Sequence, residues 1–272
     1  MAKRGFLVGI FNLISLSPAL KRLSMRLWYQ YLSRLDRGST MIFMNYGYSE
    51  ISKPKNINLK KADEKNRFCI QLYHHAVGSV NLKGLDVLEI GSGRGGGSSY
   101  IMRYLNPNSV TGIDFSKNAI EFCNRNYSIK GLSFCHGDAE SLPFENRKFD
   151  VVVNVESSHC YADIGAFLSE VYRILKPNGY FLFADFRYKN KVNFLHNKLK
   201  SSGFKILKEK NITENVLKAL DLGNKRKANL IRRKVPKIFQ KTFLHFAGIR
   251  GSELYESFKT GKRDYYSFIL QK

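Results

Sequence analysis

The residues best suited to chemistry form a glycine-rich loop at residues 87–97, VLEIGSGRGGG. An apolar run ends in Glu89 and gives way to a glycine cluster, which predicts a buried strand, a tight loop and a helix from Gly95 to about Leu105. Gly91 and Gly93 would let the backbone approach a ligand closely, because they carry no Cβ. The helix N-terminus would offer N–H groups to an anion. The loop therefore predicts a nucleotide-cofactor site.

Further acids follow the next predicted strands. The strand Ser109–Ile113 ends in Asp114, 21 residues after Gly93, where a carboxylate could accept hydrogen bonds from both hydroxyls of a ribose. The strand Leu132–His136 runs into the turn 137–140, Gly-Asp-Ala-Glu. A dinucleotide site is compatible with the glycine spacing alone, so the choice of cofactor depends on the elements around the loop.

Those elements alternate along the chain. After the first three strands, the pattern predicts a strand at Phe149–Val155, a helix over residues 164–175 closed by Lys-Pro-Asn-Gly, and a strand at Tyr180–Ala184. Beyond these we expect a helix at Asn193–Leu199, a strand at Phe204–Lys208, lysine- and arginine-rich helices over Thr213–Phe246, and a final strand at Tyr265–Leu270. Residues 52–66 are polar and predict a surface loop, followed by a helix over residues 67–80.

This series resembles the class I S-adenosylmethionine-dependent methyltransferases. The E-x-G-x-G-x-G loop, the acid after the second strand, the G-D-A turn and the L-x-P-x-G turn occur in order over residues 84–187. Five further segments resemble the phthiotriol/phenolphthiotriol dimycocerosate methyltransferase family of lipid O-methyltransferases, a relative of sterol and rifamycin-type methyltransferases. These segments are residues 44–48, 71–74, 95–100, 154–161 and 248–252. The likeness covers nearly the whole chain beyond about residue 40.

The resemblance implies an α/β, Rossmann-like class I methyltransferase fold. Its sheet would be seven-stranded and mostly parallel, with an antiparallel last strand inserted beside strand six. An N-terminal helical segment would occupy residues 1–40 and the methyltransferase domain residues 41–272. Within that domain, the cofactor core would span residues 81–188 and a helical cap about 213–246. S-adenosyl-L-methionine is the implied cofactor.

The resemblance also implies roles for individual residues. Asp114 would bind the ribose hydroxyls. Asp138 would accept from the adenine amino group, and the Ala139 N–H would contact the ring. Glu89 would lie near the methionine ammonium, or would only tether the glycine loop that contains Gly91 and Gly93.

The loop after the fourth strand holds the candidate catalytic residues, because open α/β sheets bind ligands at the carboxyl ends of their strands. An alcohol acceptor must lose its proton during methyl transfer, so a nearby base helps. His159, as a neutral imidazole with a pKa near ~6.5, is the first candidate and Glu156 the second. Either side chain could instead have a structural role. Asn154 could touch the cofactor, and Tyr46 could close over the donor or pack in an aromatic core.

Charge is distributed unevenly along the chain. The net charge is +23, with +9 in residues 1–80, −1 in residues 81–188 and +15 in residues 189–272. The excess therefore lies in the segments that build the acceptor side of a class I methyltransferase. It favours an anionic partner, either a membrane surface or nucleic acid, over a basic surface with no partner. A nucleic-acid acceptor fits less well than a small-molecule or lipid acceptor, because the fourth strand lacks an N-P-P-Y end. Sterol-type C-methylation is another alternative.

The N-terminus and the cysteines bear on location. An apolar run at residues 5–20 lies between Lys3-Arg4 and Lys21-Arg22, and its 16 residues are too short to span ~30 Å of hydrocarbon. It predicts an interfacial helix with basic flanks, a helix packed on the domain, or a targeting signal. Four scattered cysteines give no reason to expect a metal site or disulfides and suit a reducing cytosol. We expect a cytoplasmic protein with peripheral membrane binding.

Overall fold

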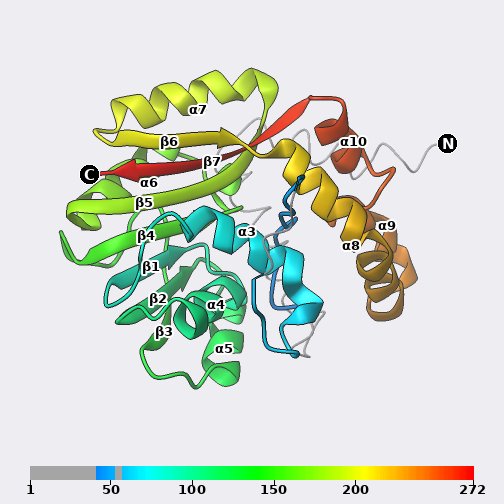
Figure 1. Cartoon of the computed structure of the whole chain (residues 1–272), viewed down its shortest axis with the longest axis horizontal. Coiled ribbons are helices and arrows are strands. Elements are labelled where there is room, and N and C mark those ends of the chain that lie inside the picture. The colour runs from blue at the N-terminus through cyan, green and yellow to red at the C-terminus, as the bar shows by residue number, and fades with distance from the viewer. Residues whose placement is uncertain (1–40, 53–56) are drawn as a thin grey trace.

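The computed structural model describes residues 41–52 and 57–272 (Figure 1). The predicted helical segment at residues 1–40 lies outside the described residues. Residues 57–63 form no regular element, as predicted, and a 3-10 turn at Glu64–Asn66 leads into the first described α-helix, α3 (Arg67–Val77).

One sheet organises the domain. Its seven strands lie in the order β3-β2-β1-β4-β5-β7-β6. Every neighbouring pair from β3 to β5 is parallel, whereas β7 pairs antiparallel with both β5 and β6. The predicted mostly parallel sheet, with its antiparallel last strand inserted beside strand six, is confirmed. The strands are β1 (Asp86–Ile90), β2 (Ser109–Asp114), β3 (Leu132–His136), β4 (Phe149–Val155), β5 (Leu175–Tyr188), β6 (Lys205–Asn211) and β7 (Arg263–Gln271).

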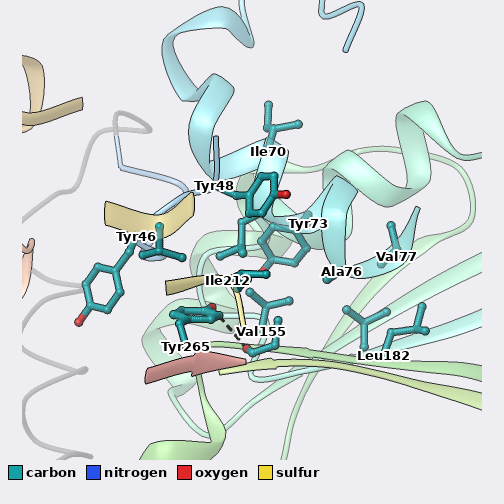
Figure 2. Close-up of a cluster of buried hydrophobic side chains, with 14 of the residues drawn as sticks. Tyr46, Tyr48, Ile70, Tyr73, Ala76, Val77, Val155, Leu182, Ile212 and Tyr265 are labelled. Carbon is teal, nitrogen blue, oxygen red and sulfur yellow. Dashed lines mark hydrogen bonds between the residues drawn. The ribbon is translucent and has the colours of Figure 1, made fainter. Parts of the chain in front are cut away.

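Helices cover both faces of the sheet because its strands are apolar on both sides. In β4, Val151, Val153 and Val155 pack into one core cluster with side chains of α3, α4, α8 and α10, as Figure 2 shows for Val155 beside α3. Val152, pointing the other way, packs with α6 and α7. These helices and their neighbours are α4 (Gly96–Tyr104), α5 (Lys117–Asn126), α6 (Ile164–Ile174), α7 (Lys189–Ser201), α8 (Thr213–Lys234), α9 (Lys237–Phe246) and α10 (Glu253–Lys259).

The predicted helical cap is two helices, α8 and α9, grouped with α10 at one side of the sheet (Figure 1). Pro236 separates α8 from α9, because it has no backbone N–H and keeps Val235 extended at φ −103°, ψ 130°. Other predicted elements are present with shifted bounds: α3 ends at Val77, while β5, α7 and β7 are longer than predicted. Among the described residues, no helix combines the length and apolar character needed to cross a bilayer.

Candidate active site

Four loops at the carboxyl ends of parallel strands line a first cavity, which we call the donor cavity. They are the glycine loop after β1, the end of β2, the turn after β3 and the loop after β4. Because these strands are neighbours in the sheet, segments far apart in sequence meet at one edge. The predicted residues gathered here are Gly91, Gly93, Asp114, Asp138, Ala139 and Glu156.

The glycine loop has a shape that only glycine tolerates at its first position. Gly91 has φ +75°, and a Cβ there would lie 2.3 Å from the Ser157 hydroxyl oxygen. The loop is fixed to the neighbouring strand, because the Gly91 N–H donates to the Ile113 carbonyl at 2.9 Å. The absence of side chains at Gly91 and Gly93 keeps the backbone open to the donor cavity.

Asp114 is held in place by backbone donors. Its Oδ2 accepts from the Gly93 N–H and its Oδ1 from the Ser116 N–H, each at 2.8 Å. Burial raises the pKa of this carboxyl, against the opposing effect of the two N–H groups. A carboxylate has about four acceptor positions, so both oxygens keep capacity for hydroxyl donors from a ligand. Asp138 Oδ1 likewise accepts from the Glu140 N–H at 3.0 Å and so shapes the turn after β3.

Glu89 is fully buried and does not line the donor cavity. Tyr73 donates its hydroxyl proton to Oε1 at 2.6 Å, and the Ser98 hydroxyl donates to Oε2. Burial raises the pKa of Glu89 to about 7, with both hydroxyl contacts opposing the rise. The carboxyl group thereby ties β1 to α3 and α4. Of the two expectations for Glu89, this geometry favours a carboxyl group that tethers the glycine loop. Within this hydrogen-bond network, Tyr73 is the residue that lines the donor cavity.

Asn154 is buried behind the cavity wall rather than in it. Its Nδ2 lies 3.0 Å from the Ile90 carbonyl, 2.7 Å from the Ser157 hydroxyl and 3.0 Å from the Tyr161 hydroxyl. The amide therefore joins the end of β1 to the loop after β4. This geometry gives Asn154 a bracing role for the loop, while its three partners Ile90, Ser157 and Tyr161 line the donor cavity. Contact of Asn154 with the cofactor stays a prediction.

A second, larger cavity of about 910 Å³ adjoins the first, and we call it the acceptor cavity. Its walls come from the loop after β4, the end of β5 and helices α7, α8 and α9. Tyr46 and His159 line it and do not line the donor cavity. Of the two expectations for Tyr46, this geometry favours packing in an aromatic core, because its ring packs on Phe186 and Phe258 with centroids 5.5 and 5.8 Å away. In Figure 2 its hydroxyl points away from the core cluster.

Glu156 lines both cavities. Its φ of +49° is unusual for a residue with a side chain and turns the chain sharply after β4. Two donors meet on Oε1, the Tyr46 N–H at 2.9 Å and the Tyr265 hydroxyl at 3.1 Å. Burial raises the pKa of Glu156 to about 8, and these hydrogen bonds act in the opposite direction. A carboxyl group that is anchored through one oxygen, with a pKa near neutrality, can exchange a proton at this junction.

His159 differs from expectation in its charge. Its Nδ1 donates to Asp185 Oδ1 at 2.8 Å, and its backbone N–H donates to Asp185 Oδ2 at 2.9 Å. Burial alone would lower the pKa of the ring, but the neighbouring Cys160 and Asp185 raise it to about 10. The ion pair with the Asp185 carboxylate favours the protonated form of the imidazole. This geometry therefore argues against the neutral base expected from the sequence. Burial opposes ionisation of Asp185, yet His159 and the Arg187 guanidinium, 3.1 Å away, lower its pKa.

The sequence analysis did not predict two of these site residues, Asp185 and Tyr265. Asp185 directly follows the predicted strand Tyr180–Ala184, so the rule that ligands bind at strand ends would have found it. Tyr265 begins the predicted last strand, and nothing in its local sequence distinguishes it from a core tyrosine. Its contact with Glu156 spans 109 residues.

A family model described as "Methyltransferase domain" matches residues 88–183. The phthiotriol/phenolphthiotriol dimycocerosates methyltransferase of Mycobacterium tuberculosis is 36% identical over 247 residues, which are 91% of this chain and 91% of that protein. This chain belongs to the same methyltransferase family. A fatty-acid O-methyltransferase of Mycolicibacterium smegmatis is 35% identical over 91% of this chain and 89% of that protein.

The fold agrees with solved structures of methyltransferases. The geranyl diphosphate C-methyltransferase from Streptomyces coelicolor, solved with S-adenosyl-L-homocysteine, has a TM-score of 0.63 at 15% identity, covering 89% of this chain and 97% of that one. At that identity the likeness shows the shared fold alone. Family membership makes this chain a methyltransferase with S-adenosylmethionine as its cofactor. The donor cavity fits such a group, since Asp114 keeps acceptor capacity there and Gly91 and Gly93 line the cavity without side chains.

Proposed function

We propose that this methyltransferase transfers a methyl group to an oxygen atom of a lipid. One observation carries the proposal: Glu156, with a raised pKa, lines both the donor cavity and the large acceptor cavity. Much of the acceptor cavity is apolar, including Phe194, Leu230 and Phe246, which favours a lipid chain over a nucleic-acid base. The names of the relatives, a phthiotriol methyltransferase and a fatty-acid O-methyltransferase, are consistent with this choice.

The donor cavity would hold the cofactor by its nucleoside. In this proposal Asp114 accepts from the ribose hydroxyls, while Asp138 and the Ala139 N–H contact the adenine. The glycine loop at Gly91 and Gly93 lies against the remainder of the molecule. When bound, S-adenosylmethionine supplies an electrophilic methyl group on a good leaving group, so the protein mainly aligns the acceptor and excludes water.

Glu156 is the proposed general base. Its Oε1 is fixed by Tyr46 and Tyr265, so Oε2 is the oxygen that would take the proton of an acceptor hydroxyl. His159 has a different role in this proposal, because a protonated ring has no vacant nitrogen with which to accept a proton. Fixed by Asp185, it would orient the acceptor oxygen by its positive charge.

The test combines lipid extracts with isotopically labelled S-adenosylmethionine. We expect label in a lipid fraction, and mass spectrometry of the product would separate a methyl ether or ester from C-methylation. Glu156→Gln should slow transfer roughly a hundredfold to ten-thousandfold, while Glu145→Gln, at an exposed loop position, should not. Label on RNA, or on a carbon atom of the acceptor, would contradict O-methylation of a lipid.

We further propose that basic segments bring the protein to anionic membranes. The end of α8 contributes three consecutive exposed cations, Arg232, Arg233 and Lys234. Each such residue adds about 1 kcal/mol near an anionic surface before screening. In flotation with anionic liposomes at low salt, replacing these three residues by glutamine should weaken binding. The matched control replaces the exposed lysines 83, 117 and 130 of the cofactor core. Equal binding by both variants, or no binding by the wild-type protein, would reject membrane recruitment by α8.

A further inference from the structure

The acceptor cavity has an unbalanced charge. Seven lysine or arginine side chains line it, against two acids, Glu156 and Asp163. Arg187 is neutralised by Asp185, and Asp163 is occupied in capping α6 through the Gly165 N–H at 2.8 Å. An apolar chain alone would not need this basic lining, because unpaired charges beside an apolar surface are costly to desolvate.

Arg94 stacks on the Phe122 ring, 3.8 Å from its centroid. Apart from Arg94 and Arg187, the five other lining cations form no ion pair with an acid in the part of the chain that the structure describes. They come from three separate elements, α7, α8 and the start of β7. Since they lie on the same cavity, their fields add at its interior, where solvent screening is weaker than at a flat surface. The five are Lys191, Lys198, Arg226, Lys227 and Arg263.

Arg263 is held against two aromatic side chains. Its guanidinium lies 4.2 Å from the centroid of the Tyr188 ring and 5.7 Å from that of Phe186, and Nη2 donates to the Tyr188 hydroxyl. Its Nε is buried and has no hydrogen-bond partner among the described residues. Buried donors are almost always satisfied in native proteins, so an unmatched one beside a cavity points to an acceptor that a ligand supplies.

The position of Arg263 relates this donor to the reaction. The Arg263 guanidinium and the Tyr46 ring pack against the same side chain, Phe186, at 5.7 and 5.5 Å from its ring centroid. Tyr46 is the residue whose backbone N–H holds Glu156. The cation therefore lies on the same side of the cavity as the proposed base.

We propose that Arg263 binds an anionic group of the acceptor, a carboxylate or a phosphate, apart from the hydroxyl that is methylated. The proposal rests on the proposed function, since it describes how the lipid is held in the acceptor cavity. Guanidinium groups bind both anions through paired N–H donors. The apolar chain would then lie along Phe194, Leu230 and Phe246.

Equilibrium binding tests this without requiring turnover. Calorimetry with S-adenosyl-L-homocysteine present would compare two matched pairs of long-chain probes: a fatty acid with its primary amide, and an alkyl phosphate with its alcohol. We expect the anionic member of at least one pair to bind roughly tenfold to a hundredfold more tightly. Arg263→Gln should abolish that preference, and Arg263→Lys should retain part of it. Arg125→Gln, an equal charge change at an exposed site on α5, should leave the preference intact.

Equal affinity for charged and neutral probes would overturn the anionic site, as would a preference that survives in folded Arg263→Gln. Melting temperatures of the variants show whether they fold, and Arg263→Lys keeps the test decisive if the glutamine variant does not. The two probe pairs distinguish a carboxylate from a phosphate. Methyl transfer is measured separately with a long-chain hydroxy fatty acid and its amide. Intact charge discrimination without any oxygen methylation would refute the proposed function and leave the anionic site standing.

Discussion

Tyr265→Phe should move the pH dependence of methyl transfer to higher pH. The hydroxyl of Tyr265 donates to Glu156 Oε1 at 3.1 Å, and this contact lowers the pKa of a carboxyl that burial has raised to about 8. Phenylalanine keeps the ring packed in the core cluster, where Figure 2 shows Tyr265 on the sheet beneath Ile212. The substitution removes one donor to the charged form of Glu156. It also removes a longer contact of the hydroxyl with the Ala184 carbonyl at 3.5 Å.

The size of the shift follows from the geometry. A hydrogen bond to a charged group contributes about 1.5–3 kcal/mol, and one pKa unit corresponds to about 1.4 kcal/mol. The 3.1 Å distance is long for a hydroxyl donating to a carboxylate, so we take the lower end, a rise of about one unit. Because the base must be ionised, activity increases with pH through its pKa. Near pH 7 about a tenth of Glu156 is ionised in the wild-type protein and about a hundredth in the variant, a roughly tenfold loss of rate.

The assay is single-turnover methyl transfer measured across the pH range. The variant should regain the wild-type rate at high pH, which a general structural defect would not allow. Tyr255→Phe is the matched control, because its hydroxyl donates to Asp221 and does not line the acceptor cavity. Infrared spectra, with Glu156→Gln as the reference, would report the protonated carboxyl independently of any acceptor. If the rate of Tyr265→Phe rises with pH over the same range as the wild-type rate, this account of Glu156 is refuted.

Three further substitutions test the donor side and the histidine. Asp114→Ala should weaken S-adenosylmethionine binding by on the order of 2–4 kcal/mol, measured by calorimetry, because two charge-assisted hydrogen bonds are lost; unchanged affinity would remove Asp114 from the site. Asp185→Asn should lower the pKa of His159, because it removes the carboxylate charge that raises this pKa. NMR titration of the ring measures the change, and an unaltered titration would contradict the His159–Asp185 ion pair. Gly91→Ala should lower the melting temperature more than Gly84→Ala, because both have φ near +75° but only Gly91 has a side-chain oxygen 2.3 Å from the new Cβ.

The residues of the donor cavity could be predicted from the sequence, because the features that mark them lie close together along the chain. An acid near the end of one strand, a glycine loop and an acid at the end of the next strand occur within 26 consecutive residues, from Glu89 to Asp114. Neighbouring parallel strands then bring these segments to one edge. Glu89 shows the limit of that reasoning, since its partner Tyr73 lies on a helix before the strand and a pattern within the loop does not include it.

The acceptor side depends on contacts between distant segments. Tyr46 reaches its place through its N–H to Glu156, 110 residues away, and through its carbonyl to Lys227, 181 residues away. Helices α5 and α10 were also not predicted, although Ser116 and Ser252 cap them through N–H groups three residues on. That spacing is a recognisable helix start. By contrast, no local pattern could have specified the contacts of Tyr46.

The two acids at the ends of β4 and β5 show how one sheet edge separates two chemical roles. Val155 pairs with Ala184, so the residues that follow them, Glu156 and Asp185, come together at that edge. Asp185 is surrounded by cations and stays ionised, whereas Glu156 meets only neutral donors and has its pKa raised to about 8. Carboxyl groups whose environments separate their pKa values in this way divide into a fixed charge and a proton acceptor. Strand pairing therefore places Asp185 where it holds His159, and places beside it Glu156, the residue that we propose as the proton acceptor.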